Sequence, residues 1–321
     1  MEIDQTSAGK AGKVSVVSEC WLREAQTFLK ESSVIKYENM LRSYILPVFG
    51  EMELSDITNE NLVSFVGDLR TNGGIKKNGL APSTVSEVVT TLNSLRIYAL
   101  RHDYAIKFTP ACVTVKNKKS SIRVFSRSEE KRLMAYLHEH MDLTSLGIII
   151  CLYTGIRIGE LCALRWDAID LFERTMQINK TVQRLRIRDN PVKKTEVRIL
   201  EPKTQNSIRT IPLPDVLVEL LEEYQTKGAF LLTGDKTRFF EPRVIQKRFK
   251  RILEKSGIAD ANFHTTRHTF ATRSVELGFD IKSLSEILGH SSVTVTMNLY
   301  VHPTMELKAE NMNRFTKIFE E

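Results

Sequence analysis

The sequence predicts a mainly α-helical protein that carries one small antiparallel β-sheet and folds as two domains. Its 321 residues exceed the usual size of a single domain. Apolar residues recur at helical spacing over most of the chain, but between Met176 and Pro214 the apolar period changes to two. A content of 42% hydrophobic and 26% charged residues is typical of a globular protein with a substantial core.

The N-terminal part is predicted to be an all-helical domain over residues 14–106, preceded by a small, polar and flexible tail over 1–13. Its helices are expected to begin at about residues 14, 34, 58 and 82. The second should stop before Pro47, because proline lacks the N–H that a helix interior needs. Residues 107–123 are predicted to be a linker, and their run 116–123 is basic and aperiodic. This run suits phosphate contacts and equally suits a solvated loop.

The second domain is expected over residues 124–321. Ser126 and Glu129 form a capping box that starts its first helix. The apolar run 143–153 is too short to span a membrane and predicts a buried helix that ends at Thr154-Gly155.

Alternating segments with turn signals between them predict about three strands between Met176 and Pro214. Helices should resume at about Pro214 and continue to the C terminus. A tail helix is expected from about residue 303, because apolar residues recur there at near-helical spacing.

The composition limits the classes of function. A formal net charge of +7 and a pI near 9.1 favour a polyanionic partner, although many basic proteins bind nothing acidic. The four cysteines show no CxxC spacing and suggest reduced thiols in a cytosolic protein. We find no signal peptide and no apolar run of membrane-spanning length, so no membrane partner is expected.

Tyr300 is the first candidate for chemistry, because Leu288-Gly289-His290, with the ionisable His290, ends the helix that precedes it. A free phenol has a pKa of about 10, so a tyrosine nucleophile needs a proton acceptor or a cationic setting. The common alternative is a tyrosine that only packs and hydrogen-bonds.

His264 and Arg267 are three residues apart at the start of a predicted helix, so both project from its first turn. Free N–H groups there also favour anions. His268 lies four residues after His264, and such a pair can bind zinc. No acidic partner or suitably spaced cysteine accompanies the pair, so we expect His268 to have a packing or supporting role and no metal to be bound.

Arg157 sits in an otherwise apolar helix start and must therefore find an anion or a carboxylate. We expect Glu160 to orient Arg157 while the remaining N–H groups face a phosphate. Lys203 lies at a turn before the last predicted strand, where a lysine is usually solvated but can also act as a proton donor.

Five motifs in order resemble the tyrosine recombinases, the family of phage integrases, Xer-type recombinases and conjugative-transposon integrases. The motifs are Thr154-Gly155-x-Arg157-x-Gly159-Glu160-Leu161, Pro202-Lys203-Thr204 before Arg209-x-Ile211-Pro212-Leu213, His264-x-x-Arg267-His268-Thr269-Phe270-Ala271-Thr272, Leu288-Gly289-His290-Ser291 and Tyr300. The resemblance covers residues 123–321, and the helical part resembles the family's core-binding domain less closely. Thr265-Thr266 and an insertion at 184–198 depart from the pattern without removing a catalytic position.

The resemblance implies a two-domain clamp on double-stranded DNA and a reaction without metal or cofactor. Tyr300 would attack a scissile phosphate and form a 3′-phosphotyrosyl bond. Arg157 and Arg267 would hold the non-bridging oxygens, and Lys203 would protonate the leaving 5′-oxygen. His264 would help to deprotonate Tyr300. His290 would hydrogen-bond the phosphate.

The implied function is site-specific recombination for integration and excision of a mobile element by a bacterial, cytoplasmic, DNA-associated protein. A homotetramer on synapsed recombination sites is expected, with accessory DNA-bending or excision factors as further partners. The tail helix would dock on a neighbouring protomer or pack on its own domain. We also expect DNA contacts from basic side chains, namely Lys36, Arg42, Arg96, Lys116, Lys118, Lys119, Arg123, Lys193, Lys194 and Arg209. The alternatives are a type IB topoisomerase and a non-cleaving DNA-binding protein of the same fold.

Overall fold

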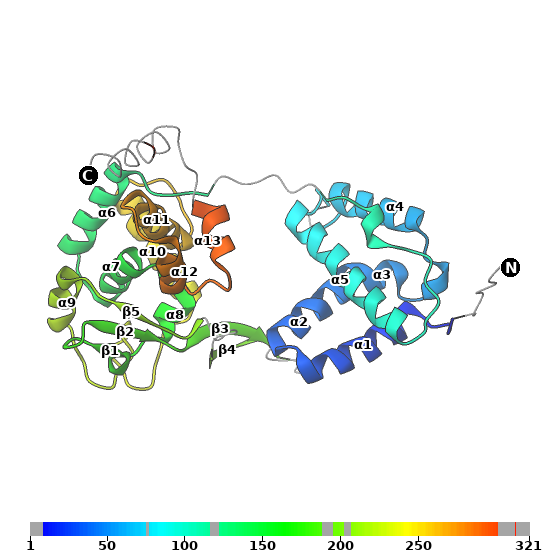
Figure 1. Ribbon diagram of the computed structural model, residues 1–321, viewed down its shortest axis with the longest axis horizontal. Helices are drawn as coiled ribbons and strands as arrows, with labels where there is room; N and C mark the ends of the chain where they lie inside the picture. The colour runs from blue at the N-terminus through cyan, green and yellow to red at the C-terminus, as the bar shows by residue number, and fades with distance from the viewer. Residues whose placement is uncertain are drawn as a thin grey trace. The chain divides into compact units, whose positions relative to one another are not determined.

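The computed structural model describes residues 9–74, 77–115, 122–187, 195–201, 207–300 and 312, without the side chain of Arg186. The chain divides into two compact units, residues 1–120 and 121–321, each with a hydrophobic core of its own (Figure 1). None of the helices in the described ranges is long and apolar enough to cross a membrane.

The N-terminal unit is a helical bundle, as the apolar spacing predicts. Its α-helices are α1 (Val14–Phe28), α2 (Glu31–Met40), α3 (Leu46–Phe49), α4 (Asn59–Thr71) and α5 (Pro82–Arg101). The start of α4 is set by Thr58, whose hydroxyl accepts a hydrogen bond from the Asn61 N–H at 3.2 Å. The side chains that face inward from the helices, such as Trp21, Leu62 and Leu92, form one core.

The expected end of the second helix before Pro47 is wrong. The chain continues from α2 through a π-helical turn, Leu41–Ile45, directly into α3, which contains Pro47. The wider turn lies just before the proline, where a regular helix would require the N–H that proline lacks.

The expected limits of this unit also need correction. Within the expected flexible tail, Lys10 N–H donates to the Asp103 carbonyl at 2.6 Å, and the Ala105 N–H donates to the Lys10 carbonyl. Residues 1–8 lie outside the described residues. Within the expected linker, Phe108 is buried in the bundle core, and the turn Pro110–Cys112 contacts α4 and α5.

The C-terminal unit places its helices around a second core. They are α6 (Arg127–Glu139), α7 (Leu143–Thr154), α8 (Ile158–Ala163), α9 (Asp215–Glu222), α10 (Pro242–Lys255), α11 (His264–Glu276), α12 (Ile281–Leu288) and α13 (Val293–Tyr300). The predicted capping box of Ser126 and the buried helix ending at Thr154 are both confirmed. Helix α7 is buried along almost its whole length and packs against α11.

The strands form two small antiparallel sheets, whereas a single sheet was expected. One has the order β1 (Ile169–Asp170), β2 (Thr175–Ile178), β5 (Arg209–Pro212), and the other pairs β3 (Thr181–Arg186) with β4 (Thr195–Leu200) (Figure 1). The two-residue β1 was missed because it is too short for an alternating pattern. The fold class, mainly helical with small antiparallel sheets, is confirmed.

Candidate active site

Segments that are far apart in the sequence meet around α11 in the C-terminal unit. Gly155 ends α7 with a φ of 65°, the left-handed conformation that glycine adopts most readily. A Cβ at Gly155 would lie 2.5 Å from a ring carbon of Phe270 on α11 and 2.8 Å from a methyl group of Leu288 on α12. Only a glycine therefore allows α7, α11 and α12 to approach this closely.

Gly159 serves the adjacent contact between α8 and β3. A Cβ there would lie 2.6 Å from the Thr181 hydroxyl and 2.8 Å from the Val182 carbonyl oxygen. Two glycines of the first motif thus set the position of Arg157, which lies between them.

Arg267 lies at the centre of this arrangement and is only 2% exposed. Its Nη1 donates to the Gly155 carbonyl at 2.8 Å, and its Nη2 donates to the Leu288 carbonyl at 2.7 Å. Burial and the charge of Arg157 both lower the pKa of Arg267, while Glu160 opposes this change. A buried guanidinium that donates to neutral carbonyls keeps a positive charge suited to an anionic ligand.

Glu160 forms ion pairs with two arginines. The pair with Arg157 was predicted, whereas the pair with Arg209 was not. Its Oε1 accepts from Arg157 Nη1 at 2.8 Å, and its Oε2 accepts from Arg209 Nη2 at 2.9 Å. Arg157 also donates to the Gly289 carbonyl at 3.0 Å. Burial raises the pKa of Glu160, but the two arginines together outweigh it, and the net pKa is lowered.

The DNA contact expected of Arg209 is not supported. Its side chain is 6% exposed, is paired with Glu160 and donates through Nε to the Ile287 carbonyl at 2.6 Å. This buried arginine therefore joins β5 to α8 and α12. Sequence reasoning missed this role because the only local signal was a basic residue on a predicted strand.

The tyrosine and the histidines lie together. Tyr300, at the end of α13, is 7% exposed, and its Oη is 2.7 Å from His268 Nδ1. The His264 ring packs edge-on against His268 with a centroid separation of 4.7 Å. The His290 ring lies parallel to Tyr300 at 6.4 Å, and its Nδ1 is 2.8 Å from the Thr296 hydroxyl.

Burial is the main cause of the altered pKa values here. It lowers the pKa of His264 and of His290 to about 4, and nearby positive charges add to the effect. Burial and the charge of Arg267 also lower the pKa of His268. The imidazoles are therefore neutral at pH 7. Burial raises the pKa of Tyr300, although Arg267 and Arg157 favour its phenolate.

The structure thus brings together Arg157, Glu160, His264, Arg267, His268, His290 and Tyr300. The sequence analysis missed Thr296, although its position four residues before Tyr300 on one helix face was a possible signal. Within the described residues, no group of three or more His, Cys, Asp or Glu side chains is arranged to hold a metal ion.

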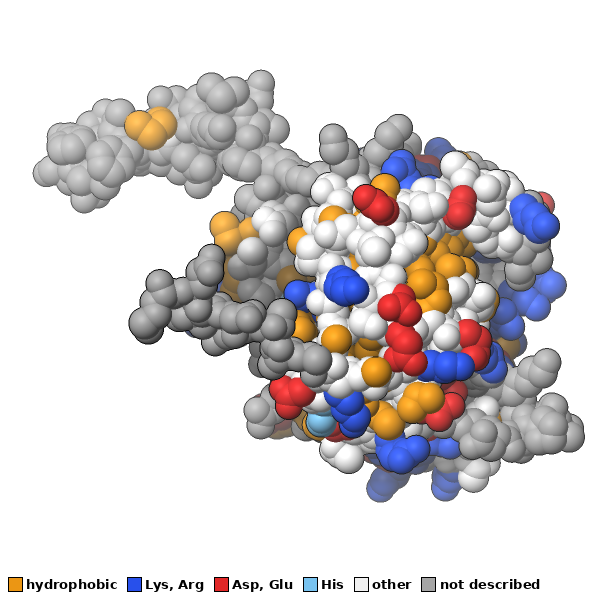
Figure 2. Space-filling model, turned by 90° about the vertical axis from the view of Figure 1, so that its right-hand side faces the viewer, with side chains coloured by type: hydrophobic (Ala, Val, Ile, Leu, Met, Phe, Trp, Pro, Cys, Tyr) orange, Lys and Arg blue, Asp and Glu red, His pale blue; other side chains and the backbone are white. Residues whose placement is uncertain are grey.

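The expected DNA-contacting residues remain predictions or lie outside the described ranges. Arg42 is exposed, Lys36 pairs with Glu87 at 2.8 Å, and Arg123 pairs with Glu129. Arg96 donates to the Phe108 carbonyl at 2.9 Å. On the face drawn in Figure 2, Lys and Arg side chains are interspersed with carboxylates, so charge alone does not mark a DNA path there. The predicted residues outside the described ranges are Lys116, Lys118, Lys119, Lys193, Lys194 and Lys203, together with the tail helix from about 303.

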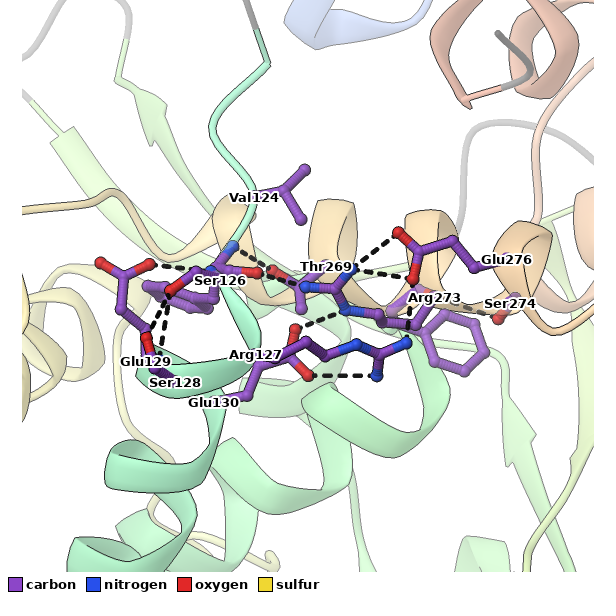
Figure 3. A network of polar contacts seen from close by, with 12 residues as sticks. Val124, Ser126, Arg127, Ser128, Glu129, Glu130, Thr269, Arg273, Ser274 and Glu276 are labelled. Atoms are coloured by element: carbon purple, nitrogen blue, oxygen red, sulfur yellow. Dashed lines mark hydrogen bonds and ion pairs between the residues drawn. The ribbon is translucent and has the colours of Figure 1, made fainter. Parts of the chain in front are cut away.

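The second half of helix α11 is also bonded to the start of α6 and to the segment that precedes it (Figure 3). Arg273 donates to Glu130 at 2.6 Å and to the Phe125 carbonyl at 2.6 Å. The Phe125 N–H donates to the Thr269 hydroxyl at 3.0 Å. Since α11 carries His264 and Arg267, this network fixes the helix that positions the site.

We expect Arg273→Met to lower the free energy of unfolding by about 2 kcal/mol, because it removes the charged hydrogen bonds that Glu130 and the Phe125 carbonyl accept from Arg273. Arg127→Met is the matched control, since Arg127 is 61% exposed and pairs with Glu130 and Glu276, the two carboxylates that also pair with Arg273. The control should lower the free energy of unfolding by less than about 1 kcal/mol, because exposed ion pairs contribute little. Urea unfolding measures both, and equal losses would contradict the anchoring role of Arg273.

Comparisons with known proteins identify the family and the fold of the chain. The model of the Phage integrase family matches residues 123–306, which is more than half of the chain, and the model described as Phage integrase, N-terminal SAM-like domain matches residues 14–69. A relative in Caldanaerobacter subterraneus subsp. tengcongensis, named Tyrosine recombinase XerC-like, is 27% identical over 93% of this chain and 81% of its own length.

Solved structures show the same fold. The Tn1549 transposon integrase, in complex with transposon right end DNA, superimposes with a TM-score of 0.74 at 21% identity and covers 94% of this chain and 99% of its own. A lambda integrase tetramer bound to a Holliday junction gives 0.65 at 16% identity and covers 91% and 80%. The chain belongs to the phage integrase family, and the resemblance to tyrosine recombinases is confirmed.

Proposed function

We propose that this protein is a site-specific DNA recombinase that cleaves and rejoins DNA through a phosphotyrosyl intermediate during integration and excision of a mobile element. The observation that carries the proposal is the position of Tyr300. Its hydroxyl is hydrogen-bonded to the neutral imidazole of His268, and the guanidinium groups of Arg267 and Arg157 favour its phenolate form.

Tyr300 Oη attacks the phosphorus and forms a 3′-phosphotyrosyl bond, and the 5′-oxygen leaves. Arg157 and Arg267 hold the non-bridging oxygens and stabilise the charge that develops on them. His290 donates a hydrogen bond to the phosphate through Nε2, since its Nδ1 is already engaged by Thr296. Lys203 protonates the leaving oxygen, and His264 assists in removing the phenolic proton.

A 5′-hydroxyl from a partner DNA then attacks the phosphotyrosine, and this exchange of one ester for another needs no external energy source. The reaction is proposed to be independent of metal, since the guanidinium groups supply the charge that a divalent cation would otherwise provide. The protein would close its two domains around double-stranded DNA and act as a tetramer, the state in which the similar lambda integrase is seen bound to a Holliday junction. Accessory DNA-bending or excision factors are further proposed partners.

A suicide substrate, nicked near the cleavage site so that the released fragment diffuses away, tests this function. The wild-type protein should form an SDS-resistant adduct in the presence of EDTA, whereas Tyr300→Phe should bind the same DNA and form none. Tyr224→Phe is a matched control, because Tyr224 lies away from the site against the main core. A wild-type protein that binds its site without forming an adduct would leave only the non-cleaving interpretation.

A further inference from the structure

Among the histidines of the site, His268 is the one that hydrogen-bonds to the hydroxyl of Tyr300. Its Nδ1 lies 2.7 Å from Tyr300 Oη, which is the ordinary length of a strong hydrogen bond. The other two histidines are placed differently, since His264 packs edge-on against His268 and His290 directs its Nδ1 to Thr296. The sequence predicted only a packing or supporting role for His268, but its Nδ1 lies within hydrogen-bond distance of the reacting oxygen.

The surroundings of His268 favour a neutral ring. His264 and Arg267 lie on its own helix, and Tyr300 faces it from α13. Burial and the positive charge of Arg267 lower the pKa of His268 below the ordinary value of 6.5. In a neutral ring with its proton on Nε2, Nδ1 is a free acceptor, and the phenol must donate the hydrogen bond.

We propose that His268 Nδ1 accepts the proton of Tyr300 during strand cleavage, which makes His268 a catalytic residue of the reaction proposed above. The Oη–H bond breaks as the Oη–phosphorus bond forms, and the proton moves to Nδ1. The bond from phosphorus to the 5′-oxygen breaks, and that oxygen takes a separate proton from Lys203. On ligation, the imidazolium returns its proton to the departing phenolate.

Bound DNA strengthens this base. Without DNA, a proton on His268 would be repelled by the positive charge of Arg267, whose hydrogen bonds go to neutral carbonyls. A phosphodiester held by Arg267 and Arg157 carries a negative charge that offsets the repulsion, so the pKa of His268 rises when the substrate is in place. The base therefore gains strength only when the phosphorus is available for attack.

The test is His268→Asn. The amide oxygen of asparagine can occupy the position of Nδ1 and accept the hydrogen bond from Tyr300, but it cannot take the proton. Adduct formation by the variant in a single turnover should be slower by roughly 10²–10⁴-fold at neutral pH. His138→Asn, at an exposed position on α6, should cleave at the wild-type rate. Equal DNA binding and thermal unfolding of the variants separate this loss from misfolding.

The pH profile distinguishes proton transfer from positioning. Wild-type cleavage should fall as the pH drops through the pKa of His268 in the complex, and it should be level above that pKa. Cleavage by His268→Asn should instead rise by about tenfold per pH unit, because hydroxide must remove the phenolic proton. A variant profile parallel to that of the wild type would overturn the proposal and leave His268 a positioning role.

A substrate with sulfur in place of the bridging 5′-oxygen separates the two proton transfers, because a thiolate leaves without being protonated. This substrate should restore cleavage to Lys203→Ala but not to His268→Asn. Restoration of both would place His268 on the leaving-group side and overturn the proposal. Failure of the wild-type protein to form any adduct would refute the recombinase function itself, whereas wild-type behaviour of His268→Asn would refute only the role of His268.

Discussion

Arg267→Gln is expected to lower the rate of strand cleavage by about 10³–10⁵-fold, which is the range found when a positioned arginine is lost from phosphoryl transfer. Arg267 is buried and donates to the Gly155 and Leu288 carbonyls, so its charge is held in place before DNA binds. The measurement is single-turnover adduct formation on the suicide substrate, with binding followed separately by gel shift.

Arg267→Lys is a second informative variant. It keeps the positive charge but loses the planar guanidinium group, which can donate to two carbonyls and a phosphate at the same time. We expect it to bind DNA and to cleave slowly. Cleavage by Arg267→Gln at the wild-type rate would show that this arginine does not stabilise the transition state.

The largest effect on stability is expected from Glu160→Gln, at about 3–5 kcal/mol, because it leaves the buried Arg209 without its counter-charge. Asp215→Asn is the matched control in the same unit, since its pair with Arg174 is exposed and should contribute less than about 1 kcal/mol. Urea unfolding measures both variants, and an equal, small loss would contradict a structural role for the buried pair.

The same carboxylate determines a pH dependence. Its pKa in the folded protein is lowered from 4.5, because the pairing with Arg209 and Arg157 outweighs the effect of burial. The stabilisation by Glu160 is therefore complete above the unfolded pKa and is lost as the pH falls through the lower, folded pKa. Glu160→Gln should remove this contribution, so its stability should fall less steeply in acid than that of the wild type.

Features that depend on neighbouring residues could be predicted from the sequence. Thr58 and Ser126 begin helices because their side chains cap the N–H groups three residues on, and Gly155 ends one because it adopts a positive φ. The pairing of Arg157 with Glu160 was predictable for the same reason, since the two residues are three positions apart on one helix start.

Features that depend on distant residues could not be predicted in this way. The ion pair of Arg209 with Glu160 joins residues 49 positions apart, and the bond from His268 to Tyr300 spans 32. The spacing of a motif indicates which side chains lie on one helix face, but it does not show which of two adjacent histidines contacts the phenol. That choice depends on how α13 packs against α11.

The central claim is that Tyr300 becomes covalently attached to DNA, and locating that bond tests it most directly. The SDS-resistant adduct can be digested with protease and nuclease and the modified peptide sequenced by mass spectrometry. We predict a nucleotide remnant linked through its 3′-phosphate to Tyr300. Attachment to any other residue, or strand cleavage that leaves no covalent product, would contradict the account.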